Sequence, residues 1–290
     1  MLQLQIENCP RDDIEALSDT LEQTAALSVT LTDKQDDPIL EPELGTTPLW
    51  PNVVVQALYA EEAEAQLAVF ILSANYPHLS YSIDTLPEKD WERVCRDDIL
   101  PQQFGHRLWI CPSWLTPPEP DAVNLMLDPG LAFGTGTHPT TALCLNWLEQ
   151  TTLDQQRVID YGCGSGILAL AALKLGAMHV DAVDIDEQAL ISTQNNATNN
   201  EISAKKLMIG FPDNLKIPAD LLIANILLMP LIQLKSRFHQ LINPSGTLVV
   251  SGILEEQVKE LIEAYQHDFT HTQSLIQDGW ALVVFCNKTP

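Results

Sequence analysis

The chain has few basic residues and no long apolar run. Its 290 residues include 15 Lys and Arg against 39 Asp and Glu, which gives a formal net charge of -24. No stripe rich in Lys or Arg appears, so we expect no direct binding to nucleic acid, whose phosphates an acidic chain repels. No stretch approaches the roughly 18 apolar residues of a membrane span. The N-terminus also lacks a signal-peptide pattern, and we expect a cytoplasmic protein with no membrane contact.

The six cysteines form no C-x-x-C pair and no Cys/His spacing typical of zinc. We therefore predict free thiols, a reducing compartment and no metal site. The acidic residues are unevenly distributed, because residues 1–100 carry 20 acids and 5 bases. Such an excess attracts a basic protein partner, although acidity that serves only solubility explains the charge equally well.

Residues 1–86 show strand and helix patterns in the order β-α-β-β-α-β. Apolar alternation predicts strands over 2–6, 27–31, 53–59 and 79–83, with helices over 12–26 and 61–75 between them. In the second helix Leu67, Phe70 and Ile71 form one apolar face. The order is typical of a small α+β ferredoxin-like domain. We interpret it as a substrate-recognition domain, with a purely structural role as the alternative. Residues 87–104 are predicted to form a linker with a connecting helix, and 105–290 a second domain.

Residues 158–168, VIDYGCGSGIL, have the pattern of a strand, a glycine-rich turn and a helix. Gly162, Gly164 and Gly166 would let a ligand approach bare backbone. The spacing is not the G-x-G-x-x-G of dinucleotide sites, since Ile167 stands where the last glycine is needed. Asp160 adds a negative charge that disfavours a phosphate. S-adenosylmethionine, which has a sulfonium and an amino group but no phosphate, fits this pattern.

Two polar residues, Asp184 and Asn225, lie at the ends of strands predicted later in the chain. Asp184 lies 22 residues after Gly162, where an acid commonly accepts hydrogen bonds from ribose hydroxyls. Asn225 ends an apolar strand and needs a polar partner. Ligands of open α/β sheets bind at this edge, although Asn225 as a turn residue is the alternative. An Asn-rich stretch before residue 200 suits the end of a helix. Alternating strands and helices, closed by a hairpin over 269–286, predict a seven-stranded, mostly parallel sheet.

The segment 128–141, DPGLAFGTGTHPTT, combines glycines and threonines with hardly any charge and precedes a helix. A polar cover over a ligand explains this composition better than an ordinary loop with a helix cap. Pro139, Thr140 or Thr141 supplies the start of the helix. His138 is open to three interpretations: a base, a ligand contact or a loop residue.

Together these blocks resemble the class I S-adenosylmethionine-dependent methyltransferases, and more narrowly the ribosomal protein L11 methyltransferase family, PrmA. The narrow resemblance rests on 128–141, 158–168, VDID at 183–186 and ANIL at 224–227. It implies an α/β fold: a seven-stranded Rossmann-like class I methyltransferase domain preceded by the small ferredoxin-like domain, which grips the substrate. It also implies methylation of lysine side chains and the N-terminal amine of a basic large-subunit ribosomal protein.

The resemblance places cofactor contacts at Thr141, Gly162, Asp184 and Asn225, with Phe133, Gly134 and Thr137 at the entrance. We expect Gly164 and Gly166 of the glycine turn to contact the cofactor as well. Our own hypothesis is that the side chain or backbone carbonyl of Asn225 orients the acceptor amine. Related amide and adenine methyltransferases carry Asn-Pro-Pro-Tyr where this chain has Asn-Ile-Leu-Leu, which argues against a planar acceptor nitrogen. The alternatives are a methyltransferase for RNA or a small-molecule amine, a module that only holds the cofactor, and, least favoured, a dehydrogenase.

Overall fold

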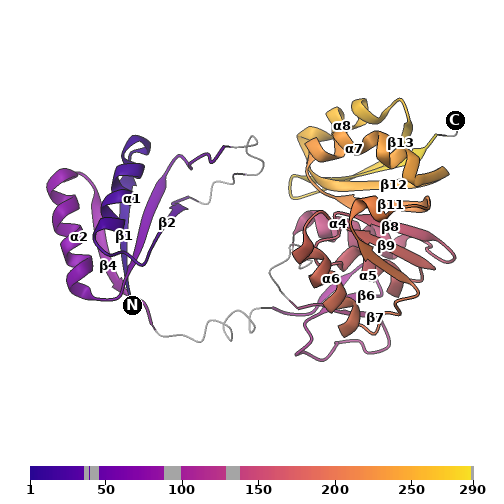
Figure 1. The fold of residues 1–290 in the computed structure, drawn as a ribbon, viewed down its shortest axis with the longest axis horizontal. Coiled ribbons are helices and arrows are strands. Elements are labelled where there is room, and N and C mark those ends of the chain that lie inside the picture. Colours follow the sequence, from indigo (N-terminus) through magenta and orange to yellow (C-terminus); the bar gives the residue numbers. More distant parts are fainter. Residues whose placement is uncertain (36–38, 40–45, 88–98, 129–137, 289–290) are drawn as a thin grey trace. The chain divides into compact units, whose positions relative to one another are not determined.

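A computed structural model describes residues 1–35, 39, 46–87, 99–128 and 138–288. The chain divides into two compact units, Met1–Arg96 and Asp97–Pro290 (Figure 1). Each unit is built on a sheet and a core of its own. No helix among the described residues is both long and apolar enough to span a membrane.

Unit 1 contains a four-stranded antiparallel sheet in the order β2-β3-β1-β4. The strands and helices alternate along the chain as β-α-β-β-α-β. Their bounds are β1 (Leu2–Cys9), η1 (Arg11–Asp13, a 3-10 turn), α1 (Ile14–Gln23), β2 (Ser28–Asp33), β3 (Val53–Tyr59), α2 (Glu62–Asn75) and β4 (Ser80–Thr85).

Both helices of unit 1 cover the same face of the sheet. Leu4 and Ile6 of β1 lie in one buried cluster with Leu17 of α1 and Leu72 of α2. The apolar face formed by Leu67, Phe70 and Ile71 of α2 is not the buried one. The helix buries Ala65, Ala68 and Leu72, whereas Leu67 and Phe70 are 51% and 73% exposed. An apolar pattern alone did not tell which of two apolar stripes faces the core.

Unit 2 contains a seven-stranded mixed sheet in the order β10-β9-β8-β11-β12-β14-β13. The first five strands in this order are parallel, and the last two form an antiparallel hairpin with β14 next to β12. The bounds are β8 (Arg157–Tyr161), β9 (His179–Val183), β10 (Leu207–Gly210), β11 (Ala219–Asn225), β12 (Ile242–Leu254), β13 (Phe269–Gln277) and β14 (Trp280–Asn287).

Helices cover both faces of this sheet, α4 to α6 on one side and α7 and α8 on the other (Figure 1). Neighbouring strand residues therefore enter different cores: Val158 packs on the first side and Ile159 on the second. This explains why the strands are continuous apolar runs rather than alternating ones. The bounds are α4 (Pro139–Gln150), α5 (Ile167–Lys174), α6 (Glu187–Asn199), α7 (Leu228–Leu241) and α8 (Val258–Tyr265), with 3-10 turns η2 (Pro212–Asn214) and η3 (Glu255–Gln257).

A separate three-stranded sheet precedes α4. It consists of β5 (Gln102–Phe104), β6 (Leu108–Cys111) and β7 (Val123–Met126). β5 pairs with β6, and Phe104 is buried in the core of unit 2. Residues 102–104, which were expected in the linker, form β5 within unit 2. Most of the remaining linker, 88–98, lies outside the described residues.

Candidate functional site

The glycine-rich turn lies between β8 and α5 and has an unusual backbone. The φ angles of Gly162, Gly164 and Gly166 are 81°, 53° and 80°, a region that other residues enter only with strain. The turn is also tightly enclosed. A Cβ atom on Gly162 would meet the Ile226 side chain at 2.5 Å, and one on Gly166 would meet Thr193 at 2.7 Å. Glycine is therefore required at both positions by conformation and by space.

Hydrogen bonds within the protein already occupy many amide N–H groups of this turn. Gly162 and Cys163 donate to the Val183 carbonyl at 2.8 and 3.0 Å, and Gly166 donates to Cys163 at 2.7 Å. In the first turn of α5, Ala169 N–H donates to Asp160 Oδ2 at 2.9 Å. Phosphate sites depend on such donors pointing at the ligand. This turn offers those donors to protein oxygens instead, so it is not built for a phosphate.

Asp184 fastens the turn to the end of β9. Its Oδ2 accepts from Gly164 N–H at 2.9 Å and its Oδ1 from Asp186 N–H at 3.0 Å. A carboxylate has about four lone-pair positions, so Asp184 retains acceptor capacity for ligand hydroxyls. Asp186 in turn caps α6 through Gln188 N–H. The two carboxylates of Asp160 and Asp184 make the site favourable for a cation.

Helix α6 holds the turn from behind, which the sequence interpretation missed. Thr193 Oγ1 donates to the Gly164 carbonyl at 3.0 Å, and Asn196 Nδ2 donates to the Ser165 carbonyl at 2.8 Å. Asn200, the cap at the end of α6, binds Met126 N–H and carbonyl. The Asn-rich stretch is therefore more than a helix stop. The sequence contains a pattern that indicates this second role. Five small or polar residues follow helical spacing, and all are buried in the structure: Ala189, Thr193, Asn196, Ala197 and Asn200.

Asn225 and Thr141 meet at the carboxyl end of β11. Asn225 ends β11, and its Nδ2 donates to Thr141 Oγ1 in the first turn of α4 at 3.3 Å. Thr141 is 1% exposed. Ile226, the next residue after Asn225, is the one that touches Gly162. The carboxyl ends of β8, β9 and β11 thus bring Gly162, Gly164, Gly166, Asp184, Asn225 and Thr141 to one edge of the sheet.

His138 caps α4, which begins at Pro139. Its Nδ1 accepts from Thr140 N–H at 3.3 Å and lies 2.7 Å from Thr140 Oγ1. The ring packs edge-on against Trp280 with centroids 4.7 Å apart. Burial lowers the pKa of His138, so the imidazole is neutral at neutral pH. With Nδ1 engaged as an acceptor, His138 is placed to position α4 rather than to remove a proton.

Burial raises the pKa of two titratable groups under the turn. It raises the pKa of Asp160 to about 7, so this carboxyl group is about half ionised at neutral pH; the Asp184 charge adds to the shift and the Ala169 hydrogen bond opposes it. Asp160 Oδ1 is buried and has no hydrogen-bond partner among the described residues. Burial also raises the pKa of Cys163, which keeps the thiol protonated. No group of three His, Cys, Asp or Glu suited to a metal occurs among the described residues.

S-adenosylmethionine fits this site on two observations. The orphaned Asp160 oxygen and the Asp184 carboxylate favour a positive charge. The engaged N–H groups do not favour a phosphate. The expected contacts Phe133, Gly134 and Thr137 lie outside the described residues, so the structure does not place them.

Comparison with known proteins decides the family. The model of the family "Ribosomal protein L11 methyltransferase (PrmA)" matches residues 1–288. The chain belongs to this family. A Legionella pneumophila ribosomal protein L11 methyltransferase is 60% identical over 286 residues, which cover 99% of both chains. A relative of the same name from Nitrosococcus oceani is 47% identical over 286 residues, 97% of both chains.

A solved structure agrees with the family assignment. The crystal structure of ribosomal protein L11 methylase from Lactobacillus delbrueckii subsp. bulgaricus superposes with a TM-score of 0.61 at 30% sequence identity. The match covers 66% of this chain and 100% of that one. In this family of methyltransferases the methyl donor is S-adenosylmethionine, which is the ligand that the glycine spacing predicted.

Proposed function

We propose that the protein transfers methyl groups from S-adenosylmethionine to amino groups of ribosomal protein L11, on lysine side chains and on the N-terminal amine. The observation that carries the cofactor is the glycine turn, whose donors are engaged and which two carboxylates flank. The family match and relatives at up to 60% identity support the acceptor.

The two units divide the work. Residues 105–290, extended to 102 by β5, form the catalytic domain, and the order of its seven strands supports a Rossmann-like class I methyltransferase fold. Residues 1–86 form a ferredoxin-like recognition domain. Its β-α-β-β-α-β order and its antiparallel sheet with both helices on one face support that fold.

The residues that would hold the cofactor are the backbone of 162–166, Asp184 for hydroxyls and Asp160 for charge. When bound, S-adenosylmethionine supplies a methyl group that its sulfonium already activates for direct displacement by a neutral amine nitrogen. The protein then needs to align the amine and exclude water, and alignment alone contributes a large part of such a rate. No activated nucleophile is required, which agrees with the protonated Cys163.

Asn225 orients the amine. Because its Nδ2 is held by Thr141, its Oδ1 can accept a hydrogen bond from the acceptor N–H. Lysine must first lose a proton, and its unperturbed pKa is about 10.4. Transfer into a partly buried crevice disfavours the ammonium and lowers this pKa. Loss of the proton to solvent before methyl transfer makes a protein base unnecessary, in keeping with the capping role of His138.

The net charge of the whole chain favours one class of partner. A net charge of -24 favours a basic protein and opposes RNA at long range. We place the protein in the cytoplasm, where ribosomal proteins are made and where its cysteines stay reduced.

The test is a transfer experiment with purified protein, methyl-labelled S-adenosylmethionine and ribosomal components from cells that lack this activity. After separation of protein from RNA, we expect the label in the L11 fraction. Label in RNA would overturn the acceptor but keep the cofactor. Binding of S-adenosylmethionine without transfer to any fraction would favour a module that only holds the cofactor.

A further inference from the structure

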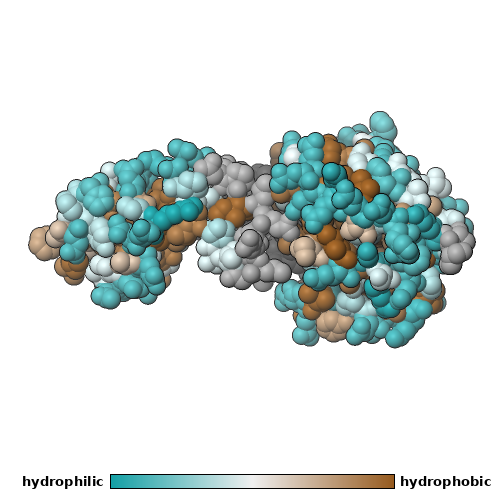
Figure 2. Space-filling model, turned by 90° about the horizontal axis from the view of Figure 1, so that it is seen from above, coloured by the Kyte–Doolittle hydropathy of each residue, from teal (hydrophilic) through white to brown (hydrophobic). Residues whose placement is uncertain are grey.

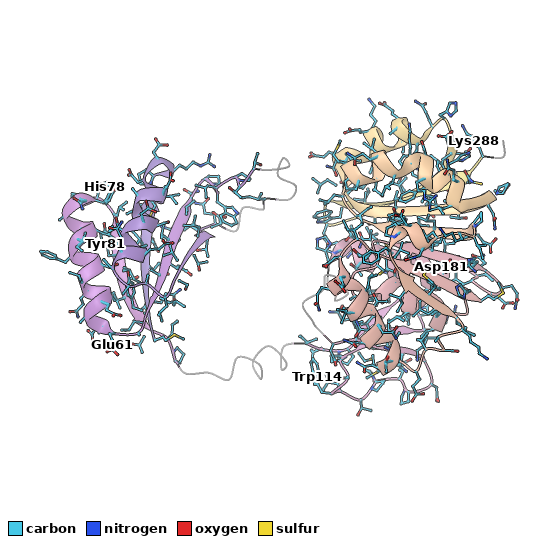
Figure 3. The ribbon with its side chains drawn as sticks, viewed as in Figure 1. Glu61, His78, Tyr81, Trp114, Asp181 and Lys288 are labelled. Atoms are coloured by element: carbon cyan, nitrogen blue, oxygen red, sulfur yellow. The ribbon has the colours of Figure 1, made fainter. Side chains whose placement is uncertain are left out.

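Helix α2 carries a second apolar stripe on the side opposite its buried one. Its members follow helical spacing: Ala63, Leu67, Phe70, Ile71 and Ala74. Phe70 is 73% and Leu67 51% exposed, and both alanines are exposed. Isolated apolar residues on a surface need no explanation, but a continuous stripe does. Figure 2 shows hydrophobic surface at the end of unit 1 where α2 lies, and Figure 3 labels Glu61 and His78 near the two ends of this helix.

Acidic side chains border this stripe. Glu62 and Glu64 flank it on opposite sides of α2. Helix α1 packs against α2. Together with the preceding turn η1, it carries an exposed row of acidic side chains at three- and four-residue spacing: Asp12, Glu15, Asp19 and Glu22. Like charges at this spacing destabilise a helix by a few tenths of a kcal/mol per pair. A partner of opposite charge would offset this cost.

The bases among the described residues of unit 1, Arg11 and Lys34, do not neutralise this surface. Arg11 binds the Leu49 carbonyl, and Lys34 pairs with Glu7 at 2.7 Å. The charge argues against a second copy of this chain as the occupant, since pairing would bring two acidic rows together. It favours a basic protein with an apolar recess.

From these observations we infer that the α2 stripe and the acidic row of α1 form the docking surface for the acceptor protein, a basic protein whose apolar recess receives Leu67 and Phe70. The inference rests on the proposed function, because it takes L11 as the occupant. It follows the mode in which anchors at i, i+3, i+4 and i+7 of one helix fill a groove. The surface would hold the acceptor while the crevice of unit 2 modifies its amines.

The test compares Leu67→Ser/Phe70→Ser with a matched control, Met178→Ser/Ile217→Ser. Met178 and Ile217 are 50% and 54% exposed and precede β9 and β11, at the sheet edge opposite the crevice. For the first variant we expect KM for L11 to rise at least about tenfold, as for anchor residues of an interface. Its melting temperature, its affinity for S-adenosylmethionine and its kcat at saturating L11 should stay unchanged. The control should match the wild type throughout.

A charge variant adds a second readout. Glu15→Gln/Asp19→Gln should raise KM for L11 and weaken its dependence on salt, because exposed charges act through screened attraction. An unchanged KM in Leu67→Ser/Phe70→Ser, with a wild type that methylates L11, would overturn the docking surface but leave the proposed function. A wild-type dimer that this variant dissociates would assign the stripe to a second copy and overturn the inference. A wild type that binds S-adenosylmethionine but neither binds nor methylates L11 would overturn both.

Discussion

At the scale of single residues, Asp160 combines a structural and an electrostatic role. Its carboxylate is completely buried, and one oxygen caps α5 while the other has no partner among the described residues. Burial raises its pKa to about 7, against roughly 3.9 in an unfolded chain. The native state therefore holds an extra proton between these values, and stability falls as pH rises through that window.

We predict that Asp160→Asn stabilises the ligand-free protein above neutral pH. The gain over the wild type should grow from about pH 4 to about pH 7, reach on the order of 4 kcal/mol, and then stay constant. The variant should also bind S-adenosylmethionine at least about tenfold more weakly, since it loses the negative charge. Urea unfolding across this pH range measures the first effect and calorimetry the second. A stability difference that does not vary with pH would contradict the raised pKa.

Asn225 and Thr141 are predicted to act as a pair. Asn225→Ala should lower kcat about 10²-fold, because the amine loses its alignment, and Thr141→Val should have a smaller effect in the same direction. The double variant should be hardly worse than Asn225→Ala alone, since residues in direct contact are not additive. Steady-state kinetics of all four enzymes give the coupling. Full additivity would show that the 3.3 Å contact has no functional consequence.

His138 is predicted to be replaceable by another capping residue. His138→Asn should retain most of the activity, whereas His138→Ala should lose about 1 kcal/mol of stability and some affinity for S-adenosylmethionine through movement of Thr141. Turnover measured as a function of pH supplies the decisive readout, and its profile should be the same for His138→Asn as for the wild type. Were His138→Asn to fold normally but lose its activity, the ring would have a chemical role.

At the scale of elements, the end of β12 fits against the turn that follows β11. Gly252 has a φ of 84°, and a Cβ there would lie 2.6 Å from the Ile226 backbone oxygen. Gly279, in the turn between β13 and β14, has a φ of 78° with nothing within 4 Å. Gly252→Ala and Gly279→Ala thus share the strain of a positive φ, and only the first adds a clash with backbone.

We predict that Gly279→Ala costs about 1–2 kcal/mol of stability with normal turnover. Gly252→Ala should cost about 2–5 kcal/mol, because the clash adds to the strain, and should also lower turnover by displacing Ile226 and Asn225. Urea denaturation and steady-state kinetics on both variants check this. Equal losses of stability and activity would show that the contact between Gly252 and Ile226 is not a constraint.

Elements with a strong period were predictable from the sequence, and those defined by distant partners were not. The strand over 53–59 has the predicted bounds, since a run with β-branched residues between turn residues strongly favours a strand of that length. β5 was missed because three residues carry no period, and its pairing with β6 alone defines it. The buried side of α2 could not be predicted because the helix has two apolar stripes, and only packing against β1 and β3 decides between them.

The same distinction holds for the site. The spacing of Gly162, Gly164 and Gly166 was readable because the turn is local, and the sheet places Asp184 and Asn225 beside it as parallel strands require. Thr193 and Asn196 went unnoticed because their function depends on carbonyls about 30 residues earlier in the chain. The cap by His138 depends on side-chain geometry that a sequence does not show.

At the scale of the whole molecule, the negative charge of the chain and the different roles of its two units indicate the same kind of partner. Unit 1 is acidic and exposes Leu67 and Phe70 of α2, while the glycine turn of unit 2 lies beside the carboxylates of Asp160 and Asp184. A basic protein with accessible amines would bind the acidic unit 1 and would supply the methyl acceptor for unit 2. We therefore predict that amino nitrogens of L11 receive the methyl groups.

The most direct measurement of that claim is tandem mass spectrometry of purified, unmethylated L11 after incubation with S-adenosylmethionine and either the wild type or Asn225→Ala. The account predicts added methyl groups on lysine side chains and the N-terminal amine with the wild type, and far fewer at equal time with the variant. Methyl groups on other atoms of L11, or none on L11 while another component is methylated, would contradict it.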